Sequence, residues 1–597
     1  MKKLLLTLCL MLTAVASWAV KAYPEPVVVT QSDGSQLTVI GYGDEDFHWY
    51  TSSDGVLLAQ KGRDFFVAAI DENGLMTATE QLAHNPSDRL EAEKQLIAKQ
   101  TPRREAFFNH ATARKKAAAQ RRISIGTTTP AYFPHSGEPK ALVILVQFSD
   151  LSFLSEDPVA SFNDYLNKEG RGQMEDRGLW EHLNLGSVQQ YFTDMSDGLF
   201  RPKFDIFGPV TMSNTSSYYG KDKGSTKDEH LNELIKEACA AIDGEVDFSQ
   251  YDSNGDGYVD LVYIIYAGYS QSITGNSADC IWPKSGTGSF GKYDGVTVSR
   301  YGVNNELNRT AGAEPVIING IGLFCHEFSH TLGLPDIYPT VSAAQNVDNQ
   351  ALEYWDLMDA GEYTDNGYVP TPYTPWEKEV MGWTEIEELT DTAQITLPQD
   401  KYYKITSKTN NEYLILQNFQ NTKWGQRVVS SSVKCHGLLV YRIDYSKTSV
   451  NLNDYPNNTA GKPGITHAPA DGLLISSYRV YGTDPSKKTD SKPYSSDEYR
   501  QSHASDPYPG TNNVTQLLSV QMNRCTIDKP IYNIKEDTES KIITFDYLKD
   551  FVAAGIDAVS SDDHSDAEIF DLQGRKMTEK ALNKGIYIKN GRKFVVK

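Results

Sequence analysis

The sequence lacks the features of several large protein classes. Among its 597 residues there are only six cysteines, and no two form a C-x-x-C pair, so a cysteine-based zinc site is not expected. No run of 18 or more uncharged apolar residues follows the N-terminal region, and we expect no transmembrane segment. Basic charge is also scarce: 57 Lys and Arg stand against 78 Asp and Glu, a formal net charge of −21. This balance argues against a nucleic-acid partner or an anionic membrane surface.

The N-terminus has the pattern of a signal peptide. Two lysines precede an apolar run over residues 4–16, and small residues follow as cleavage points. We therefore expect residues 1–22 to be a leader and the mature protein to be secreted or attached to the cell surface. Cys9 would leave with this leader. The five remaining cysteines cannot pair completely, although one or two disulfides stay open.

The motif that points most directly to chemistry is H-E-x-x-H at His326, Glu327 and His330. On a helix, positions i and i+4 share one face, so the two imidazoles can bind one zinc ion. Zinc lowers the pKa of its bound water to about 7, and a neighbouring carboxylate can then act as general base. We expect Glu327 to be that base.

The residues after the motif supply a candidate third ligand. Gly333 can end the helix in a left-handed conformation and turn the chain back, which would bring Asp336 to the metal. A carboxylate is an acceptable zinc ligand, and the fourth position is then left for water. The alternative is that Asp336 is an ordinary turn residue after Pro335.

The extended motif H-E-x-x-H-x-x-G-x-x-D, followed by Met358 in EYWDLMDAGEY, resembles the metzincin clan of zinc peptidases. In that clan a methionine forms a hydrophobic floor beneath the zinc, a role that the resemblance implies for Met358. The alternative is an ordinary core methionine. One consequence of the resemblance is an edge strand that binds the peptide substrate.

A narrower resemblance, to the immune inhibitor A family of secreted bacterial metallopeptidases, covers about residues 138–550. The similar stretches include KALVILVQFSD, SVQQYFTDMSDGLFRPKFDIFGPV, DSNGDGYVDLVYIIYAG, HEFSHTLGLPDIY and PWEKEVMGW. The resemblance implies a zinc-dependent endopeptidase that hydrolyses extracellular proteins or peptides. The sequence departs from the family at Arg442 in YRID, where histidine is more common. The last residues, with IFDLQGRKM and KGIYI, resemble the sorting module of type IX secretion and imply outer-membrane secretion machinery as a partner.

Composition and periodicity divide the chain into several units, so we expect an α+β multidomain protein. Alternating apolar and polar positions predict a β-rich N-terminal unit, whereas mixed helix and strand patterns predict the catalytic domain. Short strands with turns predict a β-sandwich-like module downstream. The expected boundaries are 1–22 for the signal peptide, 23–137 for a propeptide with a basic linker, 138–388 for a metzincin-like zinc peptidase domain, 389–550 for the β-sandwich-like domain and 551–597 for the C-terminal β module.

A second metal site is predicted in YDSNGDGYVD, which has the ligand spacing of a calcium loop. The candidate calcium ligands are Asp252, Asn254, Asp256, Tyr258 through its carbonyl, and Asp260. Gly257 would make the sharp turn, but Tyr263 stands where an EF-hand has glutamate, so the loop is not a complete EF-hand. The alternative is an Asx-rich turn that binds no metal.

The N-terminal unit is also the candidate inhibitor of the enzyme. It contains no cysteine, so a thiolate cannot cap the zinc, but GDEDFHW supplies Asp44, Glu45, Asp46 and His48 in one stretch. We expect this unit to cover the active site of a zymogen. The basic stretch 101–122 is then either a processing site or a solvated linker.

Two other classes of function compete with the peptidase. The first is a surface adhesin or a glycan- or protein-binding module on a peptidase-like fold. The second is a different zinc hydrolase, which would share the ligands but not the edge strand for peptide. The intact glutamate of the H-E-x-x-H motif favours the peptidase.

Overall fold

The computed structural model describes most of the chain: residues 16–44, 47–110, 132–223, 227–345, 347–408, 411–428, 435–445, 455–477, 495–551, 569–571, 576–578, 582–589 and 592–596. Within these residues no helix is long and apolar enough to cross a membrane. All five cysteines that follow the expected leader are free thiols, so the disulfides left open by the sequence do not form here.

The N-terminal unit is an antiparallel six-stranded meander in which neighbouring strands follow one another along the chain. Its two faces bury separate apolar clusters, with Trp49 and Leu57 on one and Leu37 and Val67 on the other. The strands are β2 (Val27–Thr30), β3 (Gln36–Gly43), β4 (His48–Ser52), β5 (Leu57–Lys61), β6 (Asp64–Ile70) and β7 (Met76–Leu82), followed by η1 (Pro86–Asp88), α1 (Glu91–Gln100) and η2 (Thr101–Arg103).

The central unit is built on a mixed six-stranded sheet with the order β1-β11-β12-β10-β8-β9. Strands β9, β8, β10 and β12 pair in parallel, β11 pairs antiparallel with β12, and β1 pairs antiparallel with β11 at the edge. The continuous apolar run KALVILVQ forms β8, as expected for a strand that is buried on both faces. The bounds are β1 (Ala16–Ala19), β8 (Lys140–Gln147), β9 (Lys203–Thr211), β10 (Val262–Tyr266), β11 (Lys284–Tyr293) and β12 (Val296–Asn305).

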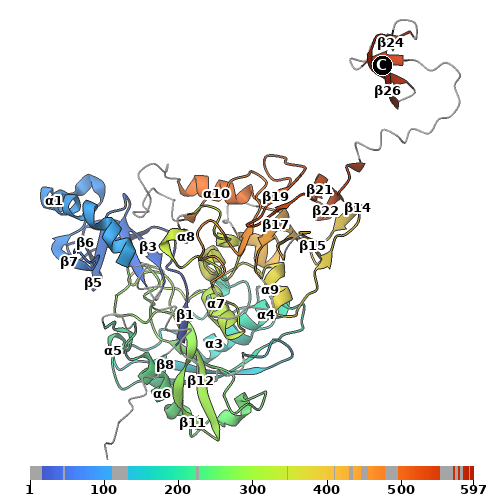
Figure 1. Cartoon of the computed structure of the whole chain (residues 1–597). Helices are drawn as coiled ribbons and strands as arrows, with labels where there is room; N and C mark the ends of the chain where they lie inside the picture. Colours follow the sequence, from blue (N-terminus) through green and yellow to red (C-terminus); the bar gives the residue numbers. More distant parts are fainter. Residues whose placement is uncertain are drawn as a thin grey trace, which may run out of the picture.

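Helices cover both faces of this sheet. Alternate residues of β8 point to opposite sides: Val143 packs in one core with α7, and Ile144 packs in another core with α6. Figure 1 shows α7 near the middle of the molecule and α6 beside β11. The helices are α3 (Pro158–Asn167), α4 (Val188–Met195), α5 (Ser216–Gly220), α6 (Leu231–Ile242), α7 (Ile321–Thr331), α8 (Ser342–Gln345) and α9 (Pro375–Val380), with η3 (Glu181–Leu183), η4 (Phe248–Tyr251), η5 (Glu353–Trp355) and η6 (Ala360–Gly367) between them.

The downstream region consists of two larger sheets and a small hairpin. A five-stranded sheet has the order β13-β15-β16-β17-β18, and a three-stranded sheet has the order β14-β22-β21. The elements are β13 (Glu387–Glu388), β14 (Ala393–Leu397), β15 (Tyr402–Thr406), β16 (Tyr413–Phe419), η7 (Lys423–Arg427), β17 (Gly437–Ile443), β18 (Ile465–His467), α10 (Ser496–Ala504), β19 (Val520–Gln521), β20 (Thr526–Ile527), β21 (Ile531–Asp537) and β22 (Ile542–Tyr547).

The five-stranded sheet shares its core with the central unit. Along β16, Leu414 and Leu416 pack toward the three-stranded sheet, whereas Ile415 packs in the same core as α7. An apolar core therefore runs across the boundary expected at residue 388. The region is also not purely β, because a capping box between Ser495 and Glu498 starts helix α10.

The C-terminal residues form a small antiparallel sheet of the order β24-β23-β25-β26. Its strands are β23 (Ile569–Asp571), β24 (Lys576–Met577), β25 (Gly585–Lys589) and β26 (Arg592–Val596).

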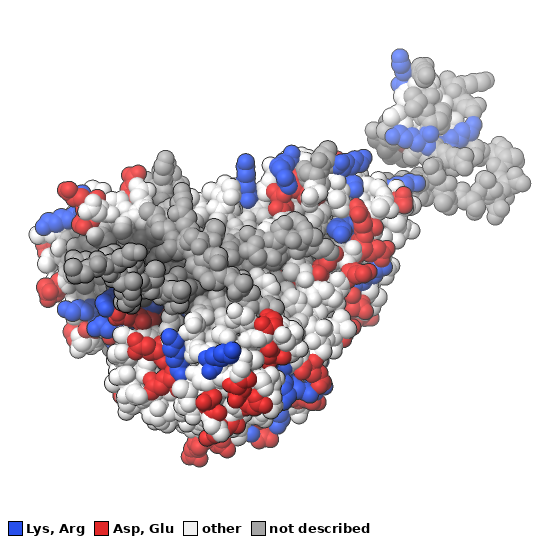
Figure 2. All heavy atoms as spheres, turned by 60° about the horizontal axis from the view of Figure 1, so that its bottom comes forward, with Lys and Arg blue, Asp and Glu red and all other residues white. Residues whose placement is uncertain are grey.

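On the face of the molecule shown in Figure 2, acidic and basic side chains of the described residues are interspersed. No continuous basic surface is seen among the described residues of this face.

Candidate active site

Helix α7 carries the H-E-x-x-H motif through the middle of the central unit. All eleven of its residues, Ile321–Thr331, are buried. Gly322 allows η6 to pack directly on the helix, since a Cβ atom there would lie 2.0 Å from the carbonyl oxygen of Glu362. The glycine therefore sets the spacing between the motif and the segment that follows Met358.

The two histidines of the motif are oriented by backbone carbonyls. The ring of His326 contacts the oxygen of Leu357 through Nδ1 at 3.0 Å, and that of His330 contacts the oxygen of Leu334 through Nδ1 at 2.7 Å. Because a carbonyl can only accept, each Nδ1 carries the proton and each Nε2 keeps its lone pair. Burial also lowers the pKa of His326, which favours the neutral imidazole that binds metals.

Asp336 returns to the histidines through the turn that ends the helix. Gly333 has φ +104, a conformation that strains residues with a Cβ atom. Asp336 Oδ1 then lies 3.4 Å from His326 Nε2 and 3.3 Å from His330 Nε2. Burial would raise the pKa of Asp336, but the neighbouring His330 and His326 outweigh it and hold the pKa well below its usual range. Asp336 is therefore a carboxylate.

These three side chains fit a bound metal. The atoms His326 Nε2, His330 Nε2 and Asp336 Oδ1 are buried and make no hydrogen bond within the described part of the chain. Their ligand atoms all lie within 4.8 Å of one another, and no other such group of His, Cys, Asp or Glu occurs among the described residues. Buried polar atoms are costly without a partner, and two nitrogens with one oxygen match a three-ligand zinc site with an open position.

Two further carboxylates flank the histidines. Glu327 is fully buried, and its Oε1 accepts a hydrogen bond from the backbone amide of Val20 at 3.1 Å. Glu362 Oε2 lies 3.5 Å from His326 Nδ1, and burial together with the charge of Glu327 raises the pKa of Glu362 well above its usual value. Sequence patterns do not predict the contact of Glu362 with His326, because nothing in the spacing shows that η6 folds back onto α7.

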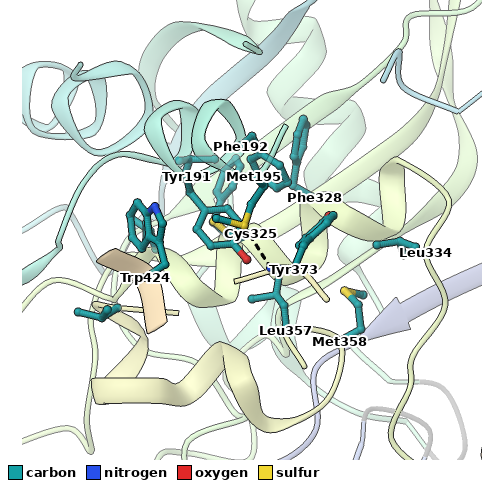
Figure 3. Packing of buried hydrophobic residues seen from close by; sticks show 14 of the residues in the cluster. Tyr191, Phe192, Met195, Cys325, Phe328, Leu334, Leu357, Met358, Tyr373 and Trp424 are labelled. Atoms are coloured by element: carbon teal, nitrogen blue, oxygen red, sulfur yellow. Dashed lines mark hydrogen bonds between the residues drawn. The ribbon is translucent and has the colours of Figure 1, made fainter. Parts of the chain in front are cut away.

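Met358 lies in a loop that contacts both His326 and the segment around Asp336. Its neighbour Leu357 orients His326, and the carbonyl of Met358 accepts from the amide of Ile337, next to Asp336. The Met358 side chain is fully buried, and Figure 3 shows it at the edge of the apolar cluster with Leu357 and Leu334. The loop thus ties the return segment to the histidines.

The expected leader enters the site instead of lying apart from it. Strand β1 runs along β11, and the chain then passes Glu327 at Val20. The ammonium of Lys21 lies 3.4 Å from Glu353 and 3.5 Å from Asp359, a contact that sequence patterns do not show. In the GDEDFHW stretch, Asp44 Oδ1 accepts from the amide of Phe47, and Glu45 and Asp46 lie outside the described residues. His48 stacks on Trp282, which in turn donates to the carbonyl of Val20.

The predicted calcium loop, residues 252–260, lies between η4 and β10 and precedes the histidines of α7 in the sequence. Its side-chain oxygens accept hydrogen bonds from backbone amides: Asp252 from Asp256 and Gly257, Asn254 from Asp256, Asp256 from Tyr258, and Asp260 from Ser253. Gly257 has φ +84, as the predicted sharp turn requires. The loop thus gathers the predicted oxygens through Asx turns.

Comparison with known proteins points to one family. Residues 134–384 match the model of the immune inhibitor A peptidase M6 catalytic domain. The chain is 27% identical over 304 residues to immune inhibitor A of Bacillus thuringiensis subsp. alesti, across 43% of this chain and 42% of that protein. It is 24% identical over 361 residues to the pre-pro-metalloprotease PrtV of Vibrio cholerae serotype O1 (strain M66-2), across 53% of this chain and 39% of that protein. The matched stretch thus spans about two fifths of each relative's length.

The helix-ending turn gives a prediction about metal affinity. We expect Gly333→Ala to weaken zinc binding, because the added Cβ is strained at φ +104 and meets the ring of Tyr132 at 3.0 Å, which displaces Asp336. Gly382→Ala is the matched control, since Gly382 also has positive φ but open space around it. Both variants should lose about 1 kcal/mol of stability from backbone strain. Only Gly333→Ala should lower zinc affinity in a competitive chelator titration, and equal affinity in the two variants would contradict this role of the turn.

Proposed function

We propose that this protein is a secreted zinc-dependent endopeptidase that hydrolyses peptide bonds in extracellular proteins. The observation that carries the proposal is the convergence of His326, His330 and Asp336 on one point beside the buried carboxylate of Glu327. The match to a peptidase catalytic domain supports the reaction class. The same three side chains would hold the zinc ion.

The chain's own groups divide the chemistry among them. Zinc supplies Lewis acidity, which polarises a carbonyl group and lowers the pKa of water toward about 7. Glu327 takes a proton from the attacking water and delivers it to the nitrogen of the leaving amine. The hydrogen bond from the backbone amide of Val20 to the carboxylate of Glu327 supports this role, because it shows that a peptide nitrogen can reach that carboxylate. The outer edge of β11, which pairs with β1, can hold an extended substrate by main-chain hydrogen bonds.

A binding protein on a peptidase-like fold is the alternative. Such a protein needs neither a complete ligand set nor a buried carboxylate beside it. The presence of both in one buried site favours the enzyme. Protein or peptide substrates follow from the proposed reaction.

The general base gives the deciding experiment. We expect Glu327→Gln to keep zinc and the fold but to lower turnover of a casein or peptide substrate by about 10²- to 10⁴-fold, because the proton acceptor is lost. Asp336→Ala should instead lower zinc content, since two histidines alone hold zinc poorly. Glu388→Gln, at an exposed glutamate, is the control and should change neither. Full proteolysis by Glu327→Gln would overturn the mechanism, and unchanged zinc affinity in Asp336→Ala would exclude Asp336 as a ligand.

We propose that the N-terminal unit keeps the enzyme latent until it is removed. The unit contacts the central unit directly, since Arg63 donates to the carbonyl of Ala311 and Gln60 donates to the carbonyl of Asn276. Residues 20–22, at the end of the expected leader, lie against Glu327 and Tyr363, where a substrate would have to bind; cleavage of the leader at Ala19, one of its small residues, would leave them on the N-terminal unit. Cleavage in the basic stretch 101–122 would release the unit.

Latency predicts a gain of activity on processing. We expect a limiting dose of trypsin to cleave within residues 101–122 and to raise peptidase activity. N-terminal sequencing of the active form should begin between about residues 104 and 140. Equal activity before and after cleavage would make the unit a folding aid and not an inhibitor.

We also propose that the loop of residues 252–260 binds calcium in a structural role. Five oxygen-bearing residues gather there, and Asp260 is buried, which raises its pKa. A cation would offset the repulsion among these carboxylates. It would also fix the loop to the start of β10.

Calcium binding predicts a change in thermal stability. Chelation should lower the melting temperature of the wild-type protein, because the clustered carboxylates lose their counter-ion. Asp256→Ala should abolish this dependence, while Asp247→Ala, at an exposed acid just outside the loop, should retain it. A melting temperature that is indifferent to calcium in the wild-type protein would leave the loop as a plain turn.

The C-terminal sheet is proposed to act in export through the outer-membrane secretion machinery. The support is the resemblance of residues 569–596 to a type IX sorting module together with their antiparallel fold. Deletion of residues 551–597 should retain the protein inside the cell. Normal export of this shortened chain would contradict the role.

A further inference from the structure

The N-terminal segment binds to the peptidase site as an extended peptide. Strand β1 adds to the edge of the sheet, with Ala16 opposite Thr287 and Ala19 opposite Lys284 in antiparallel register. In Figure 1, β1 runs beside the green strands of the peptidase sheet, close to α7. The backbone beyond β1 is then held at successive residues, because Val20 bonds to Glu327 and Trp282, and the carbonyl of Lys21 accepts from Tyr363 at 2.6 Å. These contacts use main-chain atoms, so another peptide could make them as well.

The side chain of Lys21 lies among three oxygen acceptors from the described part of the chain. Its Nζ lies 3.4 Å from Glu353 Oε2 and 3.5 Å from Asp359 Oδ1, and it donates to Ser477 Oγ at 3.4 Å. We call these three residues the lysine site. Lys21 and both carboxylates are buried, with side-chain exposures of 4% or less. An ammonium group has three N–H donors, so its geometry matches three acceptors, whereas the planar guanidinium of arginine favours a paired fork.

The acceptors of the lysine site are fixed by the peptidase body and not by Lys21. The other oxygen of Asp359 accepts from the amides of Leu352 and Glu353 at 3.2 and 2.8 Å. The other oxygen of Glu353 accepts from the amide and the hydroxyl of Ser477 at 3.0 and 3.1 Å. One oxygen of each carboxylate therefore anchors the site, and the second is presented to the cation. Such a site is preorganised for its occupant.

Charge determines which occupant the site can accept. Two carboxylates buried side by side repel each other, and an apolar or neutral side chain would leave them uncompensated. The pKa of Asp359 accordingly rises to about 7 through burial, while Lys21 acts in the opposite direction. Residues 20–22 leave with the leader if it is cleaved at Ala22, or with the N-terminal unit if the leader is cleaved at Ala19. In either case, a substrate that enters the same path meets an acidic site that fits one ammonium group.

We propose that Glu353, Asp359 and Ser477 form a specificity subsite for a substrate lysine on the C-terminal side of the scissile bond, and that Lys21 occupies it as a substrate mimic. The proposal rests on the proposed peptidase function. Glu327 faces the amide of Val20, the nitrogen that would become the leaving amine, so Lys21 marks the second residue after the cleaved bond. The enzyme then selects proteins with lysine at that position.

Binding without turnover separates this proposal from catalysis. The protein is the full chain with Glu327→Gln, which prevents cleavage, and with Lys21→Ala, which vacates the lysine site. The probe is a fluorescent peptide with the sequence of residues 17–25, SWAVKAYPE, compared with the same peptide carrying norleucine in place of its lysine. Fluorescence anisotropy should give a dissociation constant about 10- to 100-fold lower for the lysine peptide, since charge-assisted hydrogen bonds are lost with norleucine. The chain that retains Lys21 should bind the lysine peptide more weakly, because its own segment competes.

Variants of the site identify its residues. Adding Glu353→Gln should reduce the preference for lysine over norleucine toward unity, and Ser477→Ala should reduce it in part. Glu388→Gln is the control and should leave the preference unchanged. Ser477→Ala removes only a hydroxyl and keeps the test valid if Glu353→Gln does not fold, as judged by circular dichroism.

The outcomes are distinct from those for catalysis. Equal affinity for the two peptides, or a preference that survives both Glu353→Gln and Ser477→Ala, would overturn the subsite. With the wild-type base restored and the N-terminal unit removed, the ratio of kcat/KM for the two peptides should follow the same 10- to 100-fold preference. If the processed protein with wild-type Glu327 bound the lysine peptide selectively but hydrolysed neither peptide, the peptidase function would be wrong and the lysine site would be a recognition site only.

Discussion

Three buried polar atoms that meet at one point constrain the rest of the central unit. His326 and His330 present their Nε2 atoms from one face of α7, and Asp336 reaches them only because the chain reverses at Gly333. None of these atoms has a hydrogen-bond partner among the described residues, so their burial is costly unless a cation joins them. The carbonyls of Leu334 and Leu357 hold the rings in one tautomer. The helix, the turn and the loop thus together hold these three side chains around one point.

The N-terminal segment, residues 16–21, makes the backbone contacts that an extended substrate would make. An exposed sheet edge binds any extended chain through its backbone, and specificity must then come from the side-chain sites beside it. Strand β1 satisfies the edge of β11, and Lys21 supplies the charge that Glu353 and Asp359 require. Inhibition and substrate selection would therefore depend on the same contacts. A segment that mimics a good substrate blocks the site well for the same physical reason.

The central unit and the downstream five-stranded sheet share one apolar core. Ile415 and Leu439 of that sheet pack in the same core as α7, while Leu416 and Leu438 face the opposite core. Trp355 next to the site donates to Asp506, which also bonds to His467 in β18. The downstream sheet therefore stabilises the loop around Met358 and is not an independent appendage. A shift in it would reach the ligand loop through buried contacts.

The sequence by itself determined the local elements and the chemistry of the motif. The sequence predicted mixed helix and strand for the central unit, and the structure has strands β8 and β10 and helices α4, α6 and α7 there. The i, i+4 spacing likewise placed His326 and His330 on one helical face, because that relation depends only on helix geometry. Only the tertiary structure decided which distant groups meet them. Val20 at Glu327, Glu362 beside His326 and Lys21 between two acids are separated from their partners by tens to hundreds of residues, and no local period encodes such pairings. The sequence did not predict the core that crosses the boundary expected at residue 388, for the same reason. The residue pattern of a strand can show that both of its faces are apolar, but not what each face packs against.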